Sequence, residues 1–373
     1  MDIFEELSVT RYINAHDTYT VYGGSRMAPE TLAAMAQAAA SFVDLEELQR
    51  KLGAAAAELT HNEAAYFANG ASGALLTATA VCMAGGDAYR FARLPAHAPG
   101  AKTEAVVLHC QHNAYDKAIE AAGARVVEVG DADETLPFDL AGAINENTAA
   151  VFYFASTLYA RAAMPLAEVI RIAHGKGVPV VVDAAAQLPP VENLWRFTGM
   201  GADLVIFSGG KTLCGPQDSG LIVGRKHLIE DCVRFGAPAH GVCRSCKTSR
   251  EAMAGLYTAL KQYLALDQEQ NTKRLRALDE RLAAVIEQSG AGHARIVPYG
   301  PVGQTYPRVF GYLRQPGLAR RVQAAMREKH IYIGLEEAEN AVYCSPLNLT
   351  EEECTAVEGA LAECLQAGQE GTV

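Results

Sequence analysis

The stretch that decides the fold runs from Pro179 to Gly220 and reads PVVVDAAAQLPPVENLWRFTGMGADLVIFSGGKTLCGPQDSG. Residues 178–182 and 202–207 are two apolar runs, each too short for a helix and rich in branched side chains, which is typical of strands buried on both faces. Asp183 follows the first run directly, and Lys211 follows the second after a Ser-Gly-Gly turn. Because the carboxyl ends of parallel strands open onto one crevice, we expect this acid and this amine to face a single ligand.

An acid and a lysine in this arrangement are what pyridoxal 5'-phosphate (PLP) requires. A lysine amine holds the cofactor aldehyde as a Schiff base, is displaced by the substrate amine, and is then free to move protons. A carboxylate beside the pyridine nitrogen keeps that nitrogen protonated, so the ring accepts the electrons of a breaking α-carbon bond. We therefore interpret Lys211 as catalytic and Asp183 as the partner of the ring nitrogen. The alternative is a turn-capping aspartate and a solvated lysine.

Two other predicted strand ends carry groups that suit the same cofactor. Residues 64–68 form a short apolar run that ends in Asn-Gly-Ala-Ser-Gly, and residues 74–84 have the pattern of a helix of small side chains. Ser72 and free backbone N–H groups at the start of that helix make an anion site suited to a phosphate, although a simple N-cap serine has the same pattern. His112 follows the strand at 104–110 and is a candidate to stack on the pyridine ring. A helix-capping or exposed histidine is the alternative.

Composition narrows the class of protein. Half of the 373 residues are apolar, which supports one large core and a second, smaller domain. The net charge of -11, the pI of about 5.4 and the lack of a basic tract disfavour a nucleic-acid partner. The start of the chain lacks a signal-peptide pattern and no apolar run is long enough to cross a membrane, so we expect a cytoplasmic protein. Nine irregularly spaced cysteines fit reduced thiols.

His240, Cys243 and Cys246 have a spacing that a metal ion could use. A structural zinc site needs a second Cys or His pair, and none is evident in the sequence, so we expect no metal.

The order of the apolar runs predicts the architecture. Strand and helix patterns alternate along most of the chain, which predicts an α/β fold with a mostly parallel central sheet and helices on both faces. We expect an N-terminal arm with helices at 1–60, a large PLP-binding domain at 61–248, linking helices at 249–290 and a small α/β C-terminal domain at 291–373.

Five stretches, in the same order along the chain, carry a family resemblance. They are RYINAHDTYTVYGGSRMAPE at 11–30, SFVDLEELQRKLG at 41–53, ANGASGAL at 68–75, VPVVVDAAAQLPP at 178–190 and FSGGKTLCGPQDSGLIVGRK at 207–226. In these stretches the chain resembles the fold type I PLP-dependent enzymes, within them the group related to bacterial selenocysteine synthase that includes D-glucosaminate-6-phosphate ammonia-lyase. Selenocysteine synthase carries an extra N-terminal domain for its tRNA, and here the catalytic pattern begins by about Arg11, so we expect no aminoacyl-tRNA substrate.

The resemblance implies which residues hold the cofactor phosphate. By this resemblance, Lys211 forms the Schiff base with the cofactor. Ala71, Ser72 and Gly73 bind the cofactor phosphate. Ser208 matches a serine that many fold type I enzymes use on the same phosphate.

The resemblance also implies how the ring is held. His112 stacks on one face of the ring, Ala185 presses on the other, and Asp183 meets the ring nitrogen. Gln217 follows the lysine loop and reaches the neighbouring subunit's site. Gln187 departs from the pattern, because it stands one residue later than in the desulfurase-like branch.

The reaction implied is the removal of ammonia from a small amino acid or amino sugar acid. Lys211 takes the α-proton, a β-hydroxyl leaves, and the enamine hydrolyses to a keto acid and ammonia. Replacement as in selenocysteine synthase, transamination, racemisation and carbon–sulfur cleavage remain alternatives, because the outcome depends on which α-carbon bond stands perpendicular to the ring. Retention of both Asp183 and Lys211 argues against a non-enzymatic regulator.

The substrate and the assembly complete the prediction. A substrate carboxylate or phosphate needs arginine, and Arg244 and Arg308 are the candidates, with surface arginines as the alternative. The resemblance implies a homodimer or a larger assembly of dimers.

Overall fold

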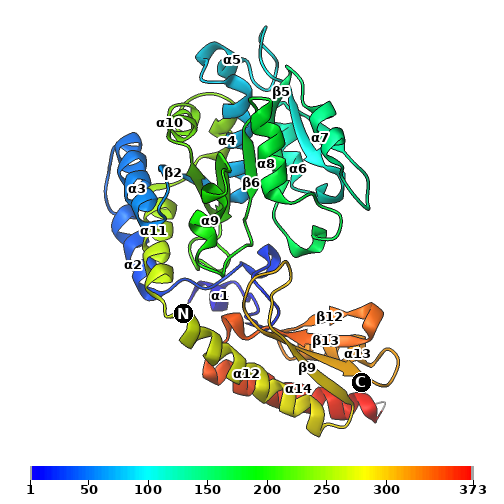
Figure 1. Cartoon of the computed structure of the whole chain (residues 1–373). Helices are drawn as coiled ribbons and strands as arrows, with labels where there is room; N and C mark the ends of the chain where they lie inside the picture. Colours follow the sequence, from blue (N-terminus) through cyan, green and yellow to red (C-terminus); the bar gives the residue numbers. More distant parts are fainter. Residues whose placement is uncertain (1, 371–373) are drawn as a thin grey trace. The chain divides into compact units, whose positions relative to one another are not determined.

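The computed structural model describes residues 2–370, and the chain divides into two compact units (Figure 1). One unit is Ser25–Ala265. The other combines the described residues of Met1–Gly24 and Leu266–Val373.

The larger unit is built on a seven-stranded sheet whose only antiparallel pairs are those of β8. In spatial order the strands are β2 (Ala64–Asn69), β8 (Ser219–Gly224), β7 (Leu204–Ser208), β6 (Val180–Asp183), β5 (Thr148–Phe154), β3 (Glu104–Leu108) and β4 (Arg125–Val129). The predicted α/β class and mostly parallel sheet are therefore confirmed. The antiparallel direction of β8 follows from the short loop that joins it to β7, since a parallel return would need a longer crossover.

Helices cover both faces of this sheet (Figure 1). Along β6, Val180 and Val182 face one hydrophobic core and Val181 faces the other, so the strand is buried on both sides as its branched side chains predict. The core that includes Val181 also contains α4 (Gly70–Ala84) and α10 (Lys226–Phe235). The opposite core contains α8 (Leu166–Gly175) and α11 (Arg250–Ala265). Shorter helices complete the unit: α5 (Ala88–Arg93), α6 (Asp116–Ala121), α7 (Pro137–Ala143) and α9 (Asn193–Gly199).

The boundaries of the units differ from the predicted ones at residues 60, 248 and 290. α2 (Pro29–Ala39) and α3 (Leu45–Leu59) belong to the larger unit, where Arg250 of α11 donates from Nε to the carbonyl of Ala38 at 2.8 Å. The chain passes into the smaller unit at Leu266, between α11 and α12 (Gln268–Gln288), so the helices predicted as one linker are divided between the units.

The smaller unit contains a four-stranded antiparallel sheet, three longer helices and the short helix α1 (Ile3–Glu6). Its strand order is β12 (Gly334–Glu336), β13 (Ala341–Cys344), β10 (Arg308–Leu313) and β9 (Gly292–Val297). α12, α13 (Leu318–Glu328) and α14 (Glu351–Gln369) share one apolar core with these strands. The start of the chain joins this unit because β1 (Ile13–Asn14) pairs in parallel with β11 (Ile331–Tyr332).

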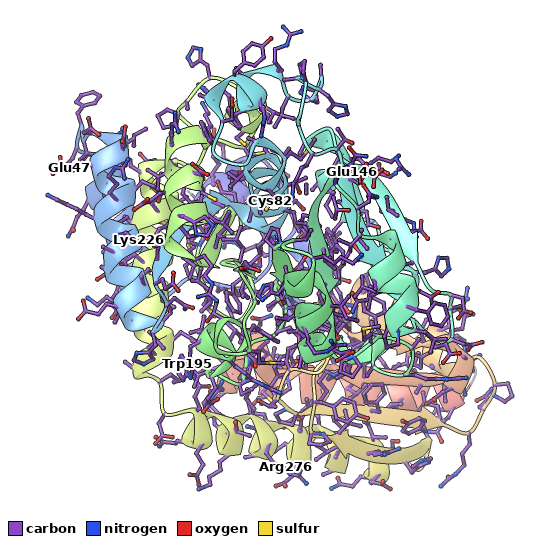
Figure 2. All side chains as sticks on the ribbon, turned by 45° about the horizontal axis from the view of Figure 1, so that its top comes forward. Glu47, Cys82, Glu146, Trp195, Lys226 and Arg276 are labelled. Carbon is purple, nitrogen blue, oxygen red and sulfur yellow. The ribbon has the colours of Figure 1, made fainter. Side chains whose placement is uncertain are left out.

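Polar and apolar side chains separate as a folded α/β protein requires. Figure 2 shows Glu47 of α3 and Glu146 at the edge of the molecule and Cys82 of α4 among packed side chains. Among the described helices, none combines the length and the apolar character that crossing a membrane demands.

One buried carboxyl makes stability depend on pH. Asp279 of α12 is fully buried, and neither carboxyl oxygen has a hydrogen-bond partner among the described residues. Burial raises the pKa of Asp279 to about 8. This pKa lies above that of an aspartate in the unfolded chain, so between the two values the folded state binds one proton more than the unfolded state. The free energy of unfolding therefore falls as the pH rises toward 8.

We therefore expect the wild-type protein to lose stability relative to Asp279→Asn between about pH 5 and pH 8, by on the order of 3 kcal/mol. Urea unfolding of both proteins at the two pH values measures this. An unchanged difference between them would show that Asp279 is ionised at both.

Candidate active site

The candidate site lies at the carboxyl ends of β6 and β7. These strands are parallel neighbours, and Asp183 at the end of β6 pairs in register with Ile206 of β7. β7 ends at Ser208, and the loop that follows carries Lys211. The structure thus brings together the acid and the lysine that the sequence assigns to one crevice.

The carboxylate of Asp183 is held from one side. The N–H of Ala185 donates to Asp183 Oδ1 at 2.9 Å, and Oδ2 has no hydrogen-bond partner among residues 2–370. Burial raises the pKa of Asp183, while the Ala185 N–H and the positive charge of Lys211 lower it. The lysine is therefore close enough to act electrostatically on the acid.

The loop that carries Lys211 is tied down through its backbone. The hydroxyl of Ser25 donates to the carbonyl of Lys211 at 2.8 Å and lies 3.1 Å from that of Gly210. A Cβ on Gly209 would lie 2.0 Å from the Ser219 hydroxyl, and a Cβ on Gly210 would lie 2.6 Å from the Cα of Gln217. Both positions therefore require glycine. The loop passes close to Ser219 of β8 at Gly209, and close to its own later residue Gln217 at Gly210.

A helix N-terminus reaches the same region. α4 begins at Gly70, without a side-chain cap, so backbone N–H groups of its first turn remain available to an anion. Ser72 in this turn is exposed. Ser208 pairs with Gly220 of β8, and a Cβ on Gly220 would lie 2.6 Å from the carbonyl oxygen of Gly70. Gly220 of β8 therefore lies next to Ser208 on one side and to the start of α4 on the other. The first turn of α4 also contains Ala71 and Gly73.

His112 lies beyond β3, and a buried acid orients it. Its Nδ1 is hydrogen-bonded to Oδ2 of Asp116, whose pKa is raised by burial and lowered by the Asn113 N–H and the His112 ring. Glu128 is also within 3.8 Å of the His112 ring. Because Nδ1 is occupied by Asp116, the ring has a defined orientation, although its side chain is exposed.

Tyr159 is a residue near these acids that the sequence did not suggest. Burial raises the pKa of Tyr159, and the charges of Asp116 and Asp183 raise it further. It also lines a cavity of about 320 Å³ beside His109, Cys110 and Arg161. The sequence could have indicated Tyr159, because it follows β5. That strand is the parallel neighbour of β6, so its carboxyl end lies at the same edge of the sheet as Asp183.

The remaining predicted residues are more scattered. Gln217 is exposed and lies against Gly210. Arg244 is exposed in the 3-10 helix η4 (Val242–Cys246). This helix lies against the first turn of α4, since a Cβ on Gly73 would lie 3.2 Å from the Cβ of Cys246. Arg308 belongs to the other unit. In residues 2–370, no three His, Cys, Asp or Glu side chains gather as a metal ion would need.

Solved structures share this fold. The structure of D-glucosaminate-6-phosphate ammonia-lyase matches with a TM-score of 0.85 and 29% identity over 99% of both chains. Serine palmitoyltransferase of Sphingomonas wittichii matches with a TM-score of 0.62 and 15% identity over 96% of this chain and 88% of that one. The parallel sheet with its single antiparallel strand, and these matches, define a fold type I PLP-dependent enzyme.

Sequence relatives narrow the class further. The SelA family model, L-seryl-tRNA selenium transferase, matches residues 115–292. D-glucosaminate-6-phosphate ammonia lyase of Salmonella typhimurium is 34% identical over 79% of this chain and 80% of its own length. A 5'-C-glycyluridine monooxygenase-decarboxylase of Streptomyces is 34% identical over 87% of this chain and 81% of its own. The chain belongs to the selenocysteine synthase-related family of fold type I enzymes that includes D-glucosaminate-6-phosphate ammonia lyase.

The packing of β8 against α4 leads to a prediction. In Gly220→Ala the new methyl group would meet the backbone of Gly70, so we expect a loss of about 1–3 kcal/mol in the free energy of unfolding. Gly142→Ala is the matched control, because a Cβ there meets nothing within 4 Å. Urea unfolding compares the two, and equal stabilities would contradict the close contact.

Proposed function

We propose that this enzyme binds PLP at the strand ends of the larger unit, with Lys211 holding the cofactor covalently. The observation that carries the proposal is the position of Asp183 at the end of β6 and of Lys211 in the loop after β7, the neighbouring parallel strand. Two features of the structure support the fit: Asp183 Oδ2 has no hydrogen-bond partner in the described part of the chain, and the first turn of α4 lacks a side-chain cap.

Each remaining residue has a role consistent with its position. Backbone groups of Ala71 and Gly73, with the hydroxyls of Ser72 and Ser208, would bind the phosphate. His112, oriented by Asp116, would lie on one face of the ring, and Ala185 on the other. Gln217 would reach the site of a second subunit.

The chemistry follows from these positions. When bound, PLP draws in the electrons left by a breaking bond at the substrate α-carbon. Asp183 would share a proton with the ring nitrogen. Lys211 would take the α-proton at Nζ.

We propose elimination of water from a β-hydroxy-α-amino acid, followed by release of ammonia. The hydroxyl leaves as water, one water is taken up in hydrolysis, and the net products are a 2-keto acid and ammonia. The names of the relatives contain three groups of this kind: D-glucosaminate, a glycyl group on the 5'-carbon of uridine, and a seryl ester. Each carries an amine on the α-carbon and an oxygen on the β-carbon. Arg244 and Arg308 are the candidates to bind the substrate's acidic groups. We further propose a cytoplasmic homodimer or larger assembly.

The direct experiment offers D-glucosaminate 6-phosphate, D-glucosaminate and serine to the PLP-loaded protein. We expect a keto acid and ammonia in equal amounts from at least one of them. Transamination or racemisation without ammonia would contradict the lyase.

A second candidate function is oxygen-dependent decarboxylation, favoured by the identity to the Streptomyces monooxygenase-decarboxylase over 87% of this chain. An oxygen electrode separates the two reactions. Oxygen uptake with release of carbon dioxide supports the oxygenase, whereas turnover without oxygen supports the lyase.

Two substitutions test the assigned roles. Lys211→Ala should abolish the yellow absorbance of bound PLP and lower kcat by at least about 10³-fold. Asp183→Asn should keep the colour and lower kcat by about 10² or more, because the ring nitrogen loses its ionic partner. Lys247→Ala is the control, since that lysine is exposed in the same unit. Full colour and activity in Lys211→Ala would refute the assignment.

A further inference from the structure

Two cysteines lie together in the 3-10 helix η4 of the larger unit. Cys243 and Cys246 are three residues apart in this helix. A 3-10 helix has three residues per turn, so side chains at this spacing eclipse each other. The rise of about 2.0 Å per residue places the two Cα atoms about 6 Å apart, within the range of about 4.4 to 6.8 Å that a disulfide spans. The local geometry therefore suits a bridge between the two sulfurs.

Both thiols are free in this structure, and they differ in their access to solvent. Cys243 is 1% exposed and belongs to the apolar core that contains α4, whereas Cys246 is half-buried at the edge of that core. Burial raises the pKa of Cys243 to about 12, and a hydrogen bond with the side chain of Thr77 lowers it. A buried thiol of this kind is inert by itself. An oxidant in solvent therefore meets Cys246 first.

The two cysteines lie along the start of α4. A Cβ on Gly73 would lie 3.2 Å from the Cβ of Cys246 and 3.6 Å from its sulfur. One turn further along α4, the hydroxyl of Thr77 donates to the carbonyl of Gly73 at 2.8 Å, and Thr77 is also the partner of Cys243. Four residues of an α-helix rise by about 6 Å, as do three residues of a 3-10 helix. The spacing of the cysteines thus matches two successive turns of α4.

His240 shares the sequence pattern of these cysteines. In the described part of the chain, however, no three His, Cys, Asp or Glu side chains gather as a metal ion would need. Two eclipsed thiols, one half-buried and one buried, form instead the arrangement in which an accessible cysteine has a second cysteine beside it to resolve its oxidation.

We propose that Cys243 and Cys246 form a reversible redox site, which a peroxide oxidises to a disulfide and which loosens the first turn of α4 when it is oxidised. The sulfur of Cys246 attacks one peroxide oxygen, the O–O bond breaks, and a sulfenic acid and one water form. The sulfur of Cys243 then attacks the sulfenic sulfur, the S–O bond breaks, and the hydroxyl leaves as a second water with the Cys243 proton. Two thiols and one hydrogen peroxide give one disulfide and two waters, so the sulfurs lose the two electrons that the peroxide gains.

Oxidation draws the sulfur of Cys246 away from α4. In a disulfide the two sulfurs are about 2.05 Å apart, whereas the reduced sulfur of Cys246 lies 3.6 Å from the Cβ position of Gly73. The turn at Gly73 then loses the side chain that packs against it, and with it the van der Waals contacts. Because the proposed function places the cofactor phosphate at this turn, the affinity for PLP should fall; this last step alone rests on the proposed function.

The disulfide is tested on the full-length protein without added PLP. The native protein is treated with hydrogen peroxide, the remaining thiols are alkylated after unfolding, and tryptic peptides are analysed by mass spectrometry. Trypsin cleaves after Arg244, so the disulfide appears as a link between two peptides that dithiothreitol separates. We expect this link and the loss of two thiols per chain, while Cys110, a half-buried cysteine of the same unit, stays reduced.

Matched variants separate the two steps of the oxidation. Cys243→Ala should stop at the sulfenic acid of Cys246, which dimedone traps as a stable adduct. Cys246→Ser should leave Cys243 reduced, because the remaining thiol is buried. Cys110→Ser is the control and should form the same link as the wild type. A wild-type protein without this link, or one that forms it only after unfolding, would overturn the redox site.

Hydrogen exchange tests the effect on α4, again without PLP. Amide exchange in residues 70–77 should be about tenfold faster in the oxidised than in the reduced protein, whereas α8, in the opposite core, should exchange equally in both. Equal exchange in residues 70–77 would overturn the proposed effect on α4.

A PLP titration of both forms separates the redox site from the proposed function. Weaker binding to the oxidised form supports both. PLP that binds neither form would refute the proposed function and leave the redox site standing. Faster exchange in residues 70–77 of the oxidised form, with equal PLP affinity, would leave the redox site standing and refute the placement of the phosphate at this turn.

Discussion

The catalytic account depends on one constraint, which is that Asp183 and Lys211 follow the carboxyl ends of two neighbouring parallel strands. Burial alone would favour the neutral form of the acid, and the positive charge of the lysine opposes this by lowering the pKa. The pair exists because two parallel strands end side by side. The loop between β7 and β8 then holds Lys211 through Ser25, at a place where only glycine fits the two preceding positions.

The smaller unit contains two buried ionisable side chains, Asp279 and Arg308, and only the aspartate can become neutral by changing its protonation. Burial raises the pKa of Asp279 to about 8, although the charges of Arg276 and Arg308 lower it, so the carboxyl keeps its proton up to about pH 8. Arg308 has no such choice, because a guanidinium stays protonated at any pH the protein meets. Aromatic rings and one carbonyl hold it, while Asp17 is satisfied by Tyr306 and Thr18.

Local patterns in the sequence predicted much of the larger unit. The apolar runs before Asp183 and Ser208 indicated buried parallel strands, and the small residues after Asn69 indicated the helix α4. Contacts between distant segments could not be predicted in this way. β1 has only two residues, and its pairing with β11 carries no signal of its own. The cavity that Tyr159 lines and the burial of Arg308 likewise depend on tertiary packing rather than on neighbours in sequence.

The most direct measurement of the central claim is where PLP attaches. The protein should be loaded with PLP, reduced with borohydride, digested, and analysed by mass spectrometry for the pyridoxyl group. The account predicts the label on Lys211 and on no other lysine. A label on a different lysine, or none in a correctly folded protein, would contradict it.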